Sequence, residues 1–311
     1  MTEVIANRNR FPIAYLLVES VIPASFKIGR NSDDLYQSQG EYQINHRSFF
    51  SLPSQTEFTR HYNVICKERG RFDLSTARLS LGDILGFHIS STTSRTDTTI
   101  FVYPSLFRIS DLPVPARGWL ETVFSRDSAI GENHFQYAGT RPYQSGDRIR
   151  MISWKATAKS NQLMVHKRET ILDDQCWIFL NIQDRDDGWD TPANRERLEL
   201  GIRYTASLVS AALKQGCKIG FACNESLSAD PNNLIRVQQG SGNLQMHHIL
   251  EKLSLLQLKP CKQFGAFLSE QTFNMRKQNI FVITAIYDTE LSQCIRSIQT
   301  KGNFVEYVLL K

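Results

Sequence analysis

The sequence has little that could cross-link it or hold it in a membrane. Its six cysteines are scattered with no CxxC pair, which excludes a recognisable disulfide framework or zinc motif. The longest apolar run near the start, Ile13 to Val18, is far too short to span a bilayer, and residues 1–10 lack the apolar core of a signal peptide. We therefore expect a cytoplasmic protein with reduced thiols and no membrane-spanning segment in this chain.

Catalytic motifs are also missing. The sequence contains no Gly-x-Ser-x-Gly elbow, no phosphate-binding loop ending in Gly-Lys-Ser and no His-Glu-x-x-His motif. No catalytic residue, cofactor or small-molecule substrate is therefore predicted. An enzyme of unknown type is kept as an alternative.

Positive charge is present and is concentrated in one place. The stretch from Tyr137 to Arg168 carries seven basic residues and a single acid, Asp147, so its net charge of +6 exceeds the +5 of the whole chain. The rest of the protein is close to neutral. Any strong electrostatic partnership is expected at this basic stretch.

The same stretch also contains residues that favour turns and a short helix. Gly139 and Gly146 permit backbone conformations closed to other residues, Pro142 fixes a turn, and Asp147 is placed to cap a short helix. Trp154 is expected to be buried, so that Trp154→Ala should cost about 3–5 kcal/mol. Two interpretations remain open: Asp147 pairs with an arginine in a packing segment between domains, or the stretch is a surface for an anionic ligand or acidic partner.

The spacing within this stretch resembles a family signature. The run Tyr143-x-x-Gly146-Asp147-x-x-Arg150-x-Ile152-x-Trp154-Lys155-Ala156-x-Ala158-Lys159 is similar to that of the DUF58 proteins, although Ser153 stands where the family commonly has an aspartate. The β-rich region upstream, with Arg69-Gly70-Arg71-Phe72, extends the resemblance to nearly the whole chain. Family members are usually anchored by hydrophobic helices, which this sequence lacks.

The resemblance implies a fold and a partner class. The C-terminal half of DUF58 proteins is similar to the von Willebrand A fold, and such proteins are commonly encoded with MoxR-type AAA+ ATPases. We assign partner binding to the charged residues of the signature: Arg141, Asp147, Arg148, Arg150, Lys155 and Lys159. The structural motif is assigned to Gly139, Tyr143, Gly146 and Trp154.

Strand-like runs dominate the N-terminal part. They are rich in β-branched and aromatic residues, and turn-forming clusters separate them, which predicts an antiparallel β-sandwich over residues 11–106. Residues 107–134, with several prolines and glycines, are predicted to be a partly mobile connector with a short helix at Arg117–Phe124. The runs are Ile13–Glu19, Tyr42–Leu52, Phe58–Lys67, Arg71–Leu74 and Thr98–Tyr103.

Strands and helices alternate in the C-terminal part. This predicts an α/β doubly wound domain with a parallel sheet and helices on both faces, which together with the signature occupies residues 135–311. The fold class is thus a two-part α+β chain. The predicted segments are strand Cys176–Ile182, helix Arg195–Lys214, strand Lys218–Cys223, helix Leu244–Leu256, strand Asn279–Ala285, helix Asp288–Gln299 and strand Phe304–Leu309.

A metal site is not expected in this domain. The von Willebrand A site takes Asp-x-Ser-x-Ser after the first strand and an aspartate after a later one, because a hard cation needs oxygen ligands that include a carboxylate. This sequence has Asn181, Gln183 and Arg185 in the first loop and Thr284-Ala285-Ile286 in the later one. A nearby acidic group is predicted to be a solvated loop beside the next helix; it comprises Asp184, Asp186, Asp187 and Asp190.

Three functions follow from these features. The first is a non-catalytic interaction or scaffold protein that works with a MoxR-type AAA+ ATPase in the assembly or maturation of other proteins. The second is nucleic-acid or other polyanion binding through Tyr137 to Arg168, where aromatic and basic residues are interleaved. The third is the enzyme of unknown type.

Overall fold

The protein, seen in a computed structural model, forms two compact units, Met1–Pro104 and Ser105–Lys311. The structure describes residues 2–28, 37–39, 43–83, 87–131, 137–144, 152–160, 162–168, 175–184, 194–227, 230 and 233–311. The division lies two residues from the domain boundary predicted at residue 106. Among the described residues, no helix combines the length and apolar character needed to cross a bilayer.

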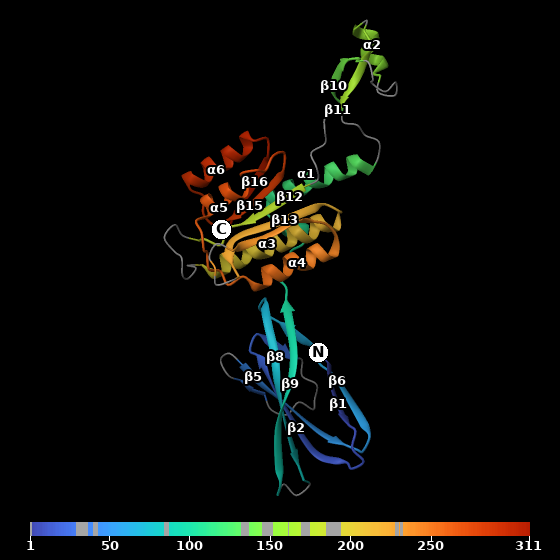
Figure 1. The fold of residues 1–311 in the computed structure, drawn as a ribbon, viewed down its shortest axis with the longest axis vertical. Coiled ribbons are helices and arrows are strands. Elements are labelled where there is room, and N and C mark those ends of the chain that lie inside the picture. Colours follow the sequence, from blue (N-terminus) through green and yellow to red (C-terminus); the bar gives the residue numbers. More distant parts are fainter. Residues whose placement is uncertain are drawn as a thin grey trace. The chain divides into compact units, whose positions relative to one another are not determined.

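The N-terminal unit is built from antiparallel strands (Figure 1). Five of them form one sheet in the order β4-β5-β2-β8-β9, and two ladders of two strands each, β1–β6 and β3–β7, accompany it. The antiparallel β structure predicted for this part is confirmed. The strands are β1 (Thr2–Asn7), β2 (Ile13–Pro23), β3 (Phe26–Ile28), β4 (Gln37–Gln39), β5 (Gln43–Leu52), β6 (Thr56–His61), β7 (Val64–Cys66), β8 (Gly70–Gly82) and β9 (Ile89–Val102).

Alternation of side chains gives the five-stranded sheet one apolar face. In β2, Leu16 and Val18 point to the same side because successive residues of a strand face opposite ways. They are buried with Phe50 and Leu52 of the neighbouring β5. These four residues form a small buried cluster on that face.

The C-terminal unit contains a mixed five-stranded sheet. Its order is β14-β13-β12-β15-β16; the four strands β13, β12, β15 and β16 are parallel, and β14 runs antiparallel at one edge. A separate antiparallel pair, β10 and β11, comes earlier in the chain. The strands are β10 (Tyr137–Pro142), β11 (Met164–Arg168), β12 (Gln175–Leu180), β13 (Lys218–Ser226), β14 (Leu234–Gly240), β15 (Asn279–Thr284) and β16 (Phe304–Leu309).

Helices cover both faces of this sheet, as predicted. Ile178 of β12 belongs to a core shared with α1, α3 and α4, whereas its neighbour Phe179 belongs to one shared with α5 and α6 (Figure 1). Within this sheet and the helices that cover it, two elements were not predicted: the antiparallel strand β14 and the helix α5. The helices are α1 (Val114–Gly131), α2 (Trp154–Ser160), α3 (Arg195–Lys214), α4 (Gly242–Leu255), α5 (Phe264–Gln271) and α6 (Thr289–Thr300), with a 3₁₀ turn at Ile109–Asp111.

Helix α1 occupies residues that were predicted to be a connector. Trp119 and Leu120 are buried in the core of the C-terminal unit, and the Trp119 ring packs 5.2 Å from that of Phe281 in β15. The prediction of a partly mobile connector with a short helix is therefore wrong for this segment. Burial of a tryptophan and its aliphatic neighbours fixes α1 as part of the domain core.

Candidate functional site

The signature segment forms a strand pair that carries a short helix. Arg141 of β10 lies opposite Val165 of β11 in the antiparallel register. The helix α2 contacts β11, where the Met164 N–H donates a 3.0 Å hydrogen bond to Thr157 Oγ1. Gly139 lies in β10, and the Tyr143 N–H donates to the Leu163 carbonyl at 2.8 Å.

Ser153 stands immediately before the first residue of α2. Its side chain is buried, and its hydroxyl accepts a 3.4 Å hydrogen bond from the Ala156 N–H. Serine and aspartate are both favoured at the position that caps a helix start. The serine found where the family commonly has aspartate therefore keeps a capping group there.

The helix start that was predicted at Asp147 falls outside the described residues. So do Gly146, Arg148 and Arg150, and nothing tests their assigned roles. A helix that starts at Asp147 would contain Ile152, because its apolar residues Ile152 and Ala156 recur at helical spacing. Ile152 instead forms an isolated antiparallel bridge with Val165.

Trp154 is exposed, and the prediction that it is buried is wrong. Its relative exposure is 68%, although it is the first residue of α2. The helix has only seven residues, and none of them is buried. Such a short element provides too little apolar surface to enclose an indole ring.

The charged side chains beside this indole are exposed too. Lys155 and Lys159 both lie on α2, and the Tyr143 ring is also exposed. The structure thus brings together two of the six predicted partner residues with Trp154 on one short helix. We call Trp154, Lys155 and Lys159 the α2 patch.

A second polar group lies where the parallel strands end. Asn181 follows β12, Asn224 lies near the end of β13, and Thr284 ends β15. Asn181 Nδ2 donates to Thr284 Oγ1 at 3.0 Å, and Asn224 Nδ2 donates to Asn181 Oδ1 at 3.1 Å. These buried side chains join three strands at the edge where ligands collect in doubly wound sheets.

The backbone completes the hydrogen bonding of these amides. Asn181 Oδ1 also accepts from the Gln183 N–H, and Asn224 Oδ1 accepts from the Ile182 N–H, both at 2.9 Å. Gln183 Oε1 accepts from the Phe264 N–H at 2.9 Å, which ties the start of α5 to this loop. We call Asn181, Gln183, Asn224 and Thr284 the amide cluster.

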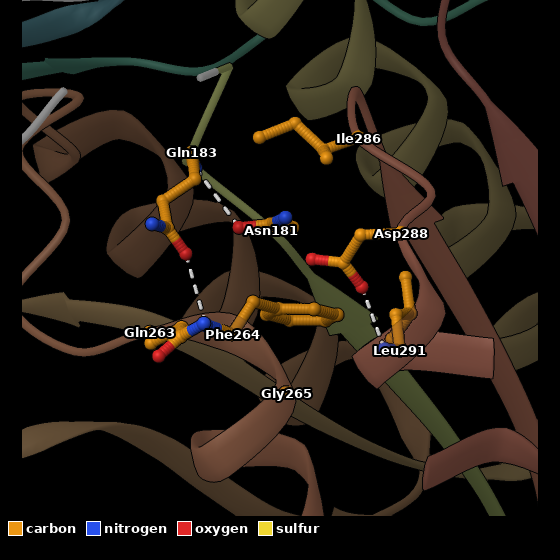
Figure 2. Close-up of a pocket in the computed structure, with 8 residues that line it drawn as sticks. All are labelled: Asn181, Gln183, Gln263, Phe264, Gly265, Ile286, Asp288 and Leu291. Carbon is orange, nitrogen blue, oxygen red and sulfur yellow. Dashed lines mark hydrogen bonds between the residues drawn. The ribbon is translucent and has the colours of Figure 1, made fainter. Parts of the chain in front are cut away.

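A small hollow lies beside the amide cluster. Asn181, Gln183, Phe264, Ile286 and Asp288 are among its lining residues, and its volume is about 20 Å³ (Figure 2). That is room for about one water molecule. Figure 2 shows the Asp288 carboxylate in this hollow, where Oδ1 accepts a 2.6 Å hydrogen bond from the Leu291 N–H as the cap of α6.

The predicted acidic loop is described only at Asp184. Its Oδ2 accepts a 2.7 Å hydrogen bond from the Asn194 N–H, and Asn194 in turn caps α3 through the Arg197 N–H. This places one carboxylate of the group beside the start of that helix, as expected. Asp186, Asp187 and Asp190 lie outside the described residues, and so does Arg185.

Two further polar side chains at this edge were not singled out from the sequence. Glu225 is buried, and its carboxylate accepts hydrogen bonds from the N–H groups of Gln257 and Leu258, at 2.6 and 3.1 Å. Arg197 donates to the carbonyls of Ala285 and Leu310. Their partners are far away in sequence, so no local pattern marks either residue.

The amide cluster has few oxygen atoms that could bind a cation. Its oxygens are uncharged and are already engaged with N–H donors, and among the described residues no group of three or more His, Cys, Asp or Glu is placed to hold a metal. The predicted loss of the metal site stays a prediction.

Comparison with known families identifies this chain. It belongs to the DUF58 family, described as a protein of unknown function, whose profile matches residues 139–308. The matched range contains both the α2 patch and the amide cluster.

Similar proteins add little beyond the family. The uncharacterized protein YeaD of Bacillus subtilis (strain 168) is 25% identical over 262 residues, which cover 84% of this chain and 59% of the relative. This chain thus spans less than two thirds of that relative's length. A solved GH20 exo β-N-acetylglucosaminidase from Vibrio harveyi matches 95% of this chain and 56% of its own, at 8% identity and a TM-score of 0.20, too low to indicate a shared fold.

Proposed function

We propose that this protein is a non-catalytic interaction protein that binds an acidic protein partner through the α2 patch. The partner class that the family resemblance suggests is a MoxR-type AAA+ ATPase, and the role is the assembly or maturation of other proteins. In this proposal a β-sandwich and a von Willebrand A-like domain without its metal serve as binding platforms.

The exposure of Trp154 is the observation that carries the proposal. Tryptophan is among the residues that most often dominate the free energy of a protein interface, and a largely exposed indole is available for burial on binding. Lys155 and Lys159 on the same helix favour a partner of negative charge. The hydrogen-bonded amide cluster supports a role that needs no cation.

Nucleic-acid binding is the second candidate, and the same exposure favours it. Proteins that bind single-stranded nucleic acid stack its bases on exposed aromatic rings and contact its phosphates with basic side chains such as lysine. Tyr143 and Trp154 both have exposed rings here, whereas the sequence had suggested that Trp154 faces inward.

A binding experiment with matched variants tests the proposal. The full chain is immobilised, and a MoxR-type AAA+ ATPase loaded with ATP is passed over it. We expect Trp154→Ala and the double variant Lys155→Glu with Lys159→Glu to weaken binding about tenfold or more each, as loss of an interface anchor does. Lys259→Glu, at an exposed loop position outside the patch, should leave binding unchanged.

The outcomes separate the two candidates. Absence of ATPase binding by the unmodified chain, or equal binding by all variants, would contradict the proposal. Binding of single-stranded DNA or RNA that weakens steeply with salt and is lost in Trp154→Ala would support the second candidate instead.

A further inference from the structure

The N-terminal unit contains a cavity of about 560 Å³ that none of the features above uses. Its floor is the apolar face of the five-stranded sheet, with Leu16, Val18 and Ile22 of β2 and Leu79 of β8. Strand β1 of the β1–β6 ladder and strand β9, both labelled in Figure 1, contribute further lining residues. The volume lies within the range of roughly 300–1,000 Å³ that small-molecule sites occupy.

The described side chains of this unit leave the space open. Among the described residues, the buried cluster on this sheet face has four members, and Ile5 of β1, which packs against it, is only partly buried. An apolar sheet face is normally covered by a second packed layer at the density of an organic crystal. Among the described residues, β1 is the strand of the β1–β6 ladder that borders this floor, so part of the described apolar surface remains for another molecule to cover.

The polar groups of the wall restrict the chemistry of that molecule. Hydroxyl groups of Ser94, Thr96 and Thr98 line the cavity along β9, and Thr96 Oγ1 already donates to the Leu74 carbonyl at 2.6 Å. Glu3 is the one ionisable side chain among the described lining residues, and its carboxylate accepts a 2.9 Å hydrogen bond from the Tyr62 hydroxyl. Arg60 lies opposite Glu3 in the β1–β6 register but is not among the described lining residues. The described lining therefore offers no cationic side chain to pair with an anionic ligand, which favours an uncharged one.

We propose that this cavity is a binding site for an uncharged, elongated apolar molecule, such as a long-chain alcohol or another neutral lipid-like chain. The aliphatic floor accommodates the chain, and the hydroxyls along β9 accept or donate hydrogen bonds to an uncharged polar end. This site lies wholly within the N-terminal unit and is independent of the α2 patch.

Fluorescence titration of the full chain with N-phenyl-1-naphthylamine, an uncharged apolar probe, tests the proposal. We expect saturable binding with one site, displacement by dodecanol and weaker displacement by dodecanoate, because the described lining offers the carboxylate no cationic partner. Ser94→Trp, at an exposed lining position on β9, should raise the Kd of the probe about tenfold or more by filling the cavity.

Thr93→Trp is the matched control. Thr93 is the preceding residue of the same strand, is equally exposed and faces the other side of the sheet, so its replacement should leave the Kd unchanged. Leu81→Trp, a lining residue on β8, serves as a second blocking variant should Ser94→Trp fail to fold. Non-saturable fluorescence, equal Kd values in blocking and control variants, stronger displacement by dodecanoate, or displacement only by an apolar peptide would each overturn the proposal.

Discussion

The side-chain amide of Asn224 donates a 3.1 Å hydrogen bond to Oδ1 of Asn181 and so joins the carboxyl ends of β13 and β12. Asn224 is fully buried, and its other contacts reach the Ile182 N–H and the Lys262 carbonyl. One side chain thus satisfies polar groups in two other segments, at residues 181–182 and at Lys262. In a buried setting, such groups are costly to leave unpaired.

Replacement of Asn224 by alanine should therefore destabilise the C-terminal unit. We expect Asn224→Ala to lower the free energy of unfolding by about 2–4 kcal/mol, because the Ile182 N–H and the Lys262 carbonyl lose their bonds to this side chain and Asn181 Oδ1 loses one of its two donors. Urea denaturation of the full chain measures the change. Asn233→Ala, at an exposed position, is the control and should be close to neutral; equal effects of the two variants would show that the amide cluster contributes nothing.

Magnesium should not stabilise the protein. A cation at the amide cluster would have to displace the hydrogen bonds that Asn181 Oδ1 accepts from Gln183 and Asn224, and no carboxylate of the cluster compensates their loss. We expect millimolar magnesium chloride to leave the melting temperature equal to that of a chelator-treated sample. A clear rise in the presence of magnesium would mean that a metal site persists at this edge.

Truncation of two tryptophans should change the free energy of unfolding by very different amounts. Trp119 is fully buried in α1, so Trp119→Ala should cost about 3–5 kcal/mol of unfolding free energy. Trp154 is mostly exposed, so Trp154→Ala should change the free energy of unfolding by less than about 0.5 kcal/mol. Urea denaturation of the two variants measures which of them loses more unfolding free energy. A larger loss in Trp154→Ala than in Trp119→Ala would mean that Trp154 is packed against the protein after all.

The phenol of Tyr62 should make the N-terminal unit sensitive to alkaline pH. Burial raises the pKa of Tyr62 above its ordinary value of 10.0, while hydrogen bonds link its hydroxyl to Ser48 and Glu3. The unfolded chain loses this proton first as pH rises. The contribution of Tyr62 to stability is therefore constant below about pH 10 and is lost as pH rises from there through the folded-state pKa.

Tyr62→Phe supplies the comparison for this effect. Urea denaturation at several pH values on either side of about pH 10 should show a smaller decline in the variant than in the unmodified chain. The pKa of Tyr307 is also raised, by its hydrogen bond to Tyr287, but this contribution is common to both proteins and cancels. Parallel pH profiles would contradict the assignment to Tyr62.

The elements that the sequence predicted best are those marked by several local signals together. Helix Arg195–Lys214 was predicted with its observed bounds, because its apolar period is regular and Gly216, with a φ of 91°, ends it. Strand Phe304–Leu309 was likewise placed with its observed bounds. The alternation of such segments was enough to predict a sheet with helices on both faces.

The elements that were missed depend on contacts distant in sequence. Pro113 and Pro115 suggested a connector, yet proline is tolerated within the first turn of a helix, and the burial of Trp119 against β15 could not be read locally. The exposure of Trp154 reflects the shortness of α2. At the amide cluster, the sequence placed Asn181 and Gln183 correctly but gave no sign of Asn224, which joins them only through the adjacent strand.

The bonds from Arg197 to the Ala285 and Leu310 carbonyls bear on how this domain can transmit a signal. They fasten the first turn of α3 to the chain just beyond β15 and β16, so sliding of that helix along the sheet would break several hydrogen bonds at once. Allosteric control by helix displacement is thereby disfavoured. Any displacement of α3 would therefore have to be coupled to a rearrangement of the chain just after β15 and β16.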